Sequence, residues 1–209
     1  MTKTTLDKLL GIDYPIIIAP MFLISNTKMI IAALQNGVSA AFPALNYRTD
    51  QELRAAIKEI KSFSTKPFGV NLIVNKSNPK YPGQLETLLE LKVDYIITSL
   101  GNPKEVIDKC KPLGIKVFCD VVDLAYAKKV ESLGADGIIA VNSKAGGHAG
   151  DIDPRSLVTL LSPFWRPSPP CRGKSHSELG SNHTDPHPSI THSQQPCLSL
   201  YVPLGESGG

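Results

Sequence analysis

The chain has 209 residues and a formal net charge of +3, with 22 Lys and Arg against 19 Asp and Glu. This length suits one domain, and the 42% of hydrophobic residues can build a core. The basic excess is scattered along the chain, which argues against a dedicated nucleic-acid surface. We therefore expect a protein that binds a small molecule.

The N-terminal segment and the cysteines predict a cytoplasmic protein. Lys3, Asp7 and Lys8 occupy the place where a signal peptide needs its apolar stretch. The longest uncharged apolar run, residues 14–26, is shorter than the about 20 residues of a membrane helix, so we expect no membrane partner. The four cysteines form no C-x-x-C pair and are too few for a disulfide scaffold, which favours reduced thiols.

Six short apolar runs, rich in Val and Ile, predict buried strands. Their apolar residues follow one another without alternation, which is typical of strands covered on both faces. The predicted strands are Tyr14–Ala19, Val38–Phe42, Phe68–Val74, Val93–Thr98, Ile115–Val121 and Ala135–Val141.

Helical patterns separate these strands. The segment 49–61 places its apolar residues on one face, and Thr49 with Glu52 has the form of a capping box. The segment 123–134 carries a second apolar stripe and ends at Gly134, a residue that tolerates the left-handed C-cap. The alternation of strand and helix predicts an α/β fold with six successive βα units. An open doubly wound sheet and a closed eightfold barrel both fit this pattern.

The composition changes at Ser162. Residues 162–209 hold eight of the 17 prolines, four of the five histidines and the only Trp. Apart from CLSLYVPL, this segment has no apolar run and no helical periodicity, so it cannot bury enough surface to offset its ordering entropy. We expect a folded part at 1–161 and a disordered, Pro/Ser/His-rich tail at 162–209. The tail histidines have no predicted helix to align them, and no metal site is predicted.

The segment AVNSKAGGHAG, directly after the sixth predicted strand, is the most informative for function. Ala145, Gly146 and Gly147 would let the backbone approach a flat ligand and leave amide N–H groups free to donate, while His148 projects among them. This arrangement suits an isoalloxazine ring with a substrate above it. The alternative interpretation is a flexible glycine loop with an incidental histidine. Catalytic groups of barrels lie after the carboxyl ends of strands, which is where this loop lies.

Two other predicted strands carry candidate ligand contacts. Pro20 and Met21 follow directly after the first strand, and Asn71 is a polar amide in the otherwise apolar third strand. A buried Asn needs hydrogen-bond partners, which either backbone groups or the edge of a ligand could supply.

Four separated motifs together resemble the nitronate monooxygenase family, flavin mononucleotide (FMN) enzymes on a TIM barrel. The motifs are GIDYPIIIAPM, FGVNLIV, GADGIIAVNS and AGGHAG, and the resemblance runs from about Leu6 to Leu161. It implies that Pro20, Met21, Asn71 and the loop Ala145–Gly147 approach the flavin. It also implies that His148 faces the substrate.

The resemblance implies oxidation of an alkyl nitronate to a carbonyl compound and nitrite, with dioxygen as electron acceptor. His148 would be a general base for a neutral nitroalkane and a hydrogen-bond partner for a nitronate. Because the resemblance ends at Leu161, it predicts an incomplete TIM barrel, without strands 7 and 8 and their phosphate-binding loops. The first and sixth strands would then be unpaired edges.

Two rival functions remain open at this point. A flavin-dependent enoyl reductase on the same barrel shares the glycine–histidine pattern but takes its electrons from NADH or NADPH. A non-catalytic, partly folded product would neither retain flavin nor unfold cooperatively.

Overall fold

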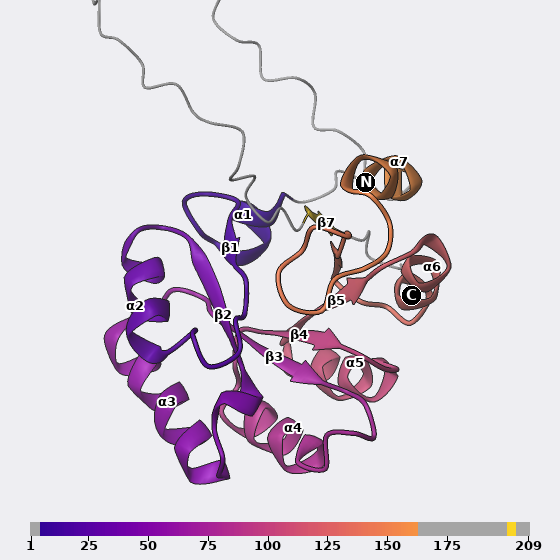
Figure 1. The fold of residues 1–209 in the computed structure, drawn as a ribbon. Helices are drawn as coiled ribbons and strands as arrows, with labels where there is room; N and C mark the ends of the chain where they lie inside the picture. The colour runs from indigo at the N-terminus through magenta and orange to yellow at the C-terminus, as the bar shows by residue number, and fades with distance from the viewer. Residues whose placement is uncertain (1–4, 163–199, 204–209) are drawn as a thin grey trace, which may run out of the picture.

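The computed structural model describes residues 5–162 and 200–203. Seven strands form one sheet, which curls so that the helices of the βα units lie on its outer side (Figure 1). The strands are β1 (Ile17–Ile18), β2 (Ser39–Pro43), β3 (Gly69–Ile73), β4 (Tyr95–Ser99), β5 (Lys116–Val121), β6 (Gly137–Ala140) and β7 (Leu200–Pro203). The helices are α1 (Leu6–Leu10), α2 (Thr27–Gln35), α3 (Asp50–Phe63), α4 (Tyr81–Glu90), α5 (Lys104–Cys110), α6 (Leu124–Ser132) and α7 (Pro154–Leu161). Two 3₁₀ turns, η1 (Ala44–Asn46) and η2 (Lys111–Leu113), complete the described elements.

Strands β1 to β6 are parallel and pair in chain order, which confirms all six predicted strands and the prediction of an incomplete (β/α) barrel. A helix follows each strand and returns the chain to the start of the next, as parallel pairing requires. In the part of the chain that the structure describes, no helix is long and apolar enough to cross a bilayer.

The sixth strand is not an edge. The short strand β7 pairs with β6 in the antiparallel sense, with Gly137 opposite Pro203 and Ala140 opposite Leu200. The expectation of an unpaired sixth strand was therefore wrong, because the apolar run near the C-terminus supplies a partner. The prediction of disorder for residues 163–199 and 204–209 lies outside the described residues and stays a prediction.

The outer face of the sheet forms the larger core. Side chains of successive strand residues point to opposite faces, so Val70, Leu72 and Ile96 pack against the helices while their neighbours point inward. Helix α3 contributes Leu53 and Ile57, both almost completely buried. The helix-facing side thus holds most of the buried apolar surface, and with it most of the hydrophobic stabilisation.

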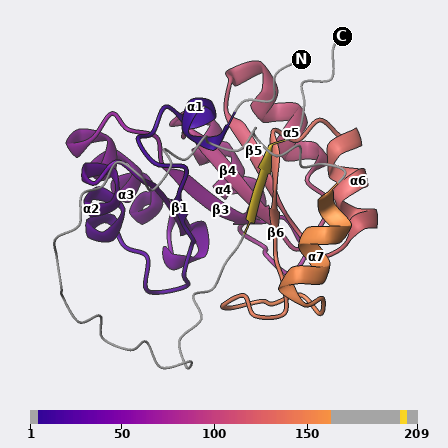
Figure 2. The same cartoon turned by 90° about the horizontal axis from the view of Figure 1, so that it is seen from above.

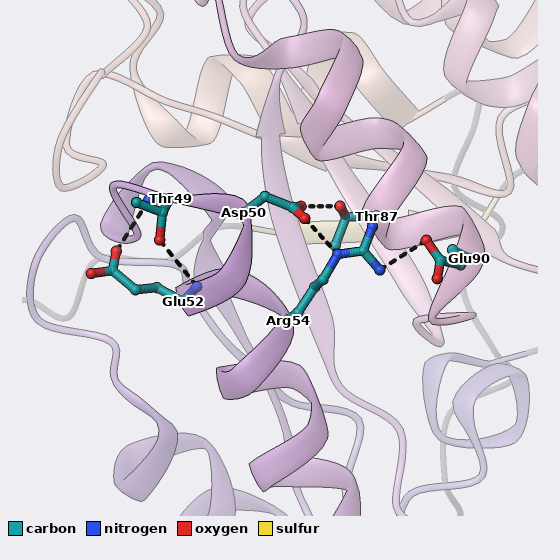
Figure 3. Close-up of polar contacts among 6 residues, drawn as sticks. All are labelled: Thr49, Asp50, Glu52, Arg54, Thr87 and Glu90. Carbon is teal, nitrogen blue, oxygen red and sulfur yellow. Dashed lines mark hydrogen bonds and ion pairs between the residues drawn. The ribbon is translucent and has the colours of Figure 1, made fainter.

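Polar groups fix the start of α3 and join it to α4 (Figure 3). The predicted capping box is confirmed: Thr49 Oγ1 accepts from the Glu52 amide at 3.2 Å, and the Glu52 carboxylate accepts from the Thr49 amide at 3.1 Å. Arg54 bridges Asp50 at 2.5 Å and Glu90 of α4 at 2.8 Å. These contacts hold neighbouring helices in register on the outside of the curl.

The inner face has a smaller core at the amino ends of the strands. Tyr95 and Phe118 pack with ring centroids 5.1 Å apart, and Leu6 and Leu10 of α1 belong to the same cluster. The Tyr95 hydroxyl lies 2.8 Å from Ser39 Oγ and donates to the Ala40 carbonyl oxygen at 3.2 Å. Helix α1 therefore closes this end of the barrel.

Gly69 of β3 provides the space for the Tyr95 ring. A Cβ atom on Gly69 would lie 2.0 Å from Tyr95 Cε2, and the ring is completely buried. We expect Gly69→Ala to lower the free energy of unfolding by about 1 to 3 kcal/mol through overpacking. Gly83→Ala is the matched control, because a Cβ there meets nothing within 4 Å in helix α4 and should stabilise by up to about 1 kcal/mol. Urea unfolding measures both changes, and equal effects would contradict the packing described for Tyr95.

Candidate functional site

The candidate site lies at the carboxyl edge of the parallel strands. Parallel pairing brings the ends of β1 to β6 to one edge, and the loops that follow β1 and β6 extend from the same end of the molecule in Figure 2. Helix α1 lies at the opposite end in that view. The predicted contacts Pro20, Met21, Asn71 and 145–148 therefore all belong to elements that meet at this edge.

The loop after β1 is held by one asparagine of η1. Asn46 Oδ1 accepts from the Leu23 amide at 2.8 Å, and Asn46 Nδ2 donates to the Ser25 carbonyl oxygen at 2.8 Å. The Met21 amide donates to Ser25 Oγ at 2.9 Å. Pro20 and Met21 are half-buried. Asn46, which the sequence patterns had not singled out, therefore ties this loop to η1.

This same loop exposes a run of large apolar side chains. Phe22, Leu23 and Ile24 are 60%, 73% and 62% exposed. Leu23 also has a φ of 60°, a left-handed conformation that is uncommon for a residue other than Gly. An apolar surface in a fixed conformation at a strand end is suited to cover a flat aromatic ligand.

The loop after β6 is hydrogen-bonded to Asn142, a second residue that the sequence patterns did not single out. The Asn142 carbonyl oxygen accepts from the amides of Ala145 at 3.1 Å and Gly150 at 3.2 Å, and Asn142 Oδ1 accepts from the Lys144 amide at 2.8 Å. A Cβ on Gly150 would lie 2.4 Å from the Val141 carbonyl oxygen, so this position requires glycine. The base of the loop is therefore fixed.

The tip of this loop is open. Gly146, Gly147 and His148 are exposed, and Gly147 has a φ of +75° that suits glycine. Within residues 5–162, no acceptor is recorded for the three amide groups and no partner for the His148 ring. Exposed amides at a strand end can bind the polar edge of a ligand.

The inner face carries a chain of polar side chains across three neighbouring strands. Asn71 Nδ2 donates to Ser99 Oγ at 2.7 Å, and Ser99 Oγ donates to Asp120 Oδ2 at 2.5 Å. Asn71 Nδ2 also lies 3.2 Å from the Ile97 carbonyl oxygen. Burial raises the pKa of Asp120 to about 6, and the hydrogen bond from Ser99 opposes this rise.

Sequence reasoning had found Asn71 but not its partners. Backbone and neighbouring groups satisfy the Asn71 Nδ2 donors, which was one of the two alternatives. The available signal for Asp120 was a carboxyl group in the otherwise apolar segment VFCDVV. No hydrogen bond among the described residues joins His148 to Asn71, Ser99 or Asp120.

The described cysteines and acidic groups offer no competing site. Cys110 and Cys119 are free and buried, and burial raises the pKa of each thiol to about 12, so neither is a thiolate at neutral pH. Across residues 5–162, no group of three or more His, Cys, Asp or Glu is placed to hold a metal ion.

A curled parallel sheet with helices outside and ligand-accessible loops at its carboxyl edge defines the (β/α) barrel class of proteins. Residues 3–84 match the family model described as "Nitronate monooxygenase". This match confirms the predicted resemblance over the first two of the four motifs. The matched range includes Pro20, Met21 and Asn71 and ends before the glycine loop.

Curated relatives include proteins with more than one described activity. The chain is 30% identical over 161 residues to "(3aS,4S,5R,7aS)-5-hydroxy-7a-methyl-1-oxo-octahydro-1H-indene-4-carboxyl-CoA dehydrogenase" of Rhodococcus jostii, covering 77% of this chain and 44% of that protein. It is 28% identical to a nitronate monooxygenase of Paraburkholderia phytofirmans, covering 78% of this chain and 54% of that protein. The chain thus spans about half the length of the curated relatives it matches.

Solved structures agree with the fold. FabK from Thermotoga maritima superposes with a TM-score of 0.72 at 30% identity, over 78% of this chain and 51% of FabK. Nitroalkane oxidase from Streptomyces ansochromogenes superposes with a TM-score of 0.66 at 23% identity, over 76% of this chain and 56% of that chain.

The raised pKa of Asp120 predicts a pH dependence of stability. The folded state keeps a proton that the unfolded state releases, so the free energy of unfolding falls as the pH rises from the usual Asp pKa toward about 6. Asp120→Asn removes this titration. Allowing for solvent contact, the variant should gain about 2 kcal/mol relative to the unmodified chain between about pH 4 and pH 7. Urea unfolding at both pH values tests this, and an unchanged difference would contradict it.

Proposed function

We propose that this chain binds FMN at the carboxyl edge of its strands and oxidises alkyl nitronates to carbonyl compounds and nitrite with dioxygen. The observation that carries the proposal is the family match over residues 3–84, which includes the ends of β1 and β3. The glycine loop after β6, with its exposed imidazole, extends from the same edge. The natural substrate would be a small nitronate or nitroalkane.

The residues of this edge fit the flat ring of a flavin. Pro20 and Met21 belong to a fixed loop with an apolar surface, and the amides of Gly146 and Gly147 have no described acceptor. Ala145 is half-buried beside them, and Asn71 offers its amide oxygen on the inner face. We assign these six residues to ring binding. Complete barrels build a phosphate site in the loops after their seventh and eighth parallel strands. Such parallel strands are not among the described elements.

When bound, the flavin would supply the redox chemistry, and the protein would position the substrate. The exposed His148 ring can take a proton from the carbon next to the nitro group of a neutral nitroalkane. A nitronate has already lost this proton, so His148 only has to donate a hydrogen bond to it. The rigid base of the loop, fixed by Asn142, would hold the imidazole near the ring.

This division of roles predicts different effects of His148→Asn on two forms of one substrate. We expect kcat/KM to fall about 100-fold with neutral nitroethane, the loss typical of a missing general base. With ethyl nitronate the loss should stay below about tenfold, since Asn still donates a hydrogen bond. Asp151→Asn, a change at an exposed residue of the same loop, is the control and should leave both values unchanged. Equal losses for both substrates would contradict proton abstraction by His148.

A flavin-dependent enoyl reductase is the second candidate, and the superposition on FabK favours it. The two functions differ in the electron donor. Anaerobic mixing of the flavin-loaded chain with ethyl nitronate should bleach the flavin absorption if the proposal is correct, and NADPH or NADH should not. Bleaching by a nicotinamide cofactor alone would support the reductase. Bleaching by neither would leave a flavin-binding chain without the proposed activity.

A further inference from the structure

The polar chain on the inner face connects the candidate flavin contact Asn71 to a carboxyl group two strands away. Asn71, Ser99 and Asp120 lie on the adjacent strands β3, β4 and β5, with 2.7 Å and 2.5 Å between successive partners. All three residues are half-buried, whereas the neighbouring residues that face the helices, such as Leu72 and Cys119, are fully buried. The three hydrogen-bonded side chains are thus accessible from the inside of the curl.

The ionised form of Asp120 sets the direction of every hydrogen bond in this chain. A carboxylate only accepts, so the Ser99 hydroxyl must donate its single proton to Asp120. Ser99 Oγ can then only accept from Asn71, which requires the amide nitrogen of Asn71 on this side. The second N–H of the same nitrogen faces the Ile97 carbonyl oxygen at 3.2 Å, which only accepts. Both amide protons are therefore committed to the protein.

We propose that Asp120 is a positioning residue: through Ser99 it fixes the Asn71 amide so that Oδ1 is presented as an acceptor for the single N–H of an oxidised flavin ring. This inference rests on the function proposed above, because the ligand is taken to be a flavin. In residues 5–162, no hydrogen bond to Asn71 Oδ1 is recorded, which leaves it available. The site would thereby favour a ring whose edge donates a proton over one that only accepts.

The first arm of the test examines the ligand-free chain. The side-chain amide signal of Asn71 in ¹⁵N NMR, assigned by its loss in Asn71→Ala, should exchange slowly with solvent in the unmodified chain. Ser99→Ala and Asp120→Ala should each speed this exchange about tenfold, because each removes a hydrogen-bonding side chain from the row Asn71–Ser99–Asp120. Ser99→Thr, which keeps the hydroxyl, should restore protection. Unchanged exchange in both alanine variants would overturn the positioning role.

The matched control is Thr98→Val on the same strand. Thr98 Oγ1 also bonds to β5, lying 3.2 Å from Cys119 Sγ and 3.4 Å from the Phe118 carbonyl oxygen, but it is on the helix-facing side. This variant removes a buried hydroxyl between β4 and β5 without touching the inner chain. It should lower stability and leave the Asn71 exchange rate unchanged.

The second arm measures flavin binding with riboflavin and with 3-methylriboflavin, which lacks the ring N–H. The unmodified chain and Thr98→Val should bind riboflavin about tenfold more tightly than the methylated ring, and Ser99→Ala and Asp120→Ala should lose this preference. Equal binding of both flavins by the unmodified chain would overturn the inference while leaving the proposed function intact. A chain that binds neither flavin would contradict the proposed function and the assigned ligand, and the exchange rates would still decide whether Asp120 positions Asn71.

Discussion

The register of the six parallel strands sets which side chains line each face of the sheet. Side chains alternate between the two faces of a strand, so the register decides which residues meet the helices and which face the inside of the curl. With Asn71 opposite Ile97 and Ile97 opposite Phe118, the polar side chains Asn71, Ser99 and Asp120 fall on the same face. A slip of one residue in β5 would turn Asp120 toward the helices and leave a buried carboxyl group without its Ser99 partner.

This alternation also places the residues that stabilise the fold and the residues proposed to bind the ligand on different faces of the sheet. The helix-facing side is closed and apolar, and the amino ends of the strands are sealed by α1 and the Tyr95 ring. The inner residues nearest the carboxyl edge are half-buried and polar, and the loops at that edge are fixed by asparagines at their bases. The carboxyl edge can therefore carry an exposed glycine loop and a carboxyl group of raised pKa, because the packing that stabilises the molecule lies elsewhere.

The sequence was sufficient to predict the elements whose signals are local. The six strands follow from short apolar runs, and the start of α3 follows from Thr49 and Glu52, which lie three residues apart. The partners of Asn71 could not be predicted, because Ser99 and Asp120 reach it only through the pairing of β3 with β4 and of β4 with β5. The antiparallel pairing of β7 was missed for the same reason, since it joins segments about 60 residues apart, and no local pattern encodes such a contact.

Flavin retention tests whether the described strands and loops form a flavin site. The purified chain would be incubated with FMN, freed of unbound cofactor on a desalting column, and examined by visible absorption. We expect the flavin bands to elute with the protein, and we expect Gly150→Ala, which forces a Cβ against the Val141 carbonyl oxygen, to weaken them. A colourless protein whose strands are intact by circular dichroism would contradict the claim.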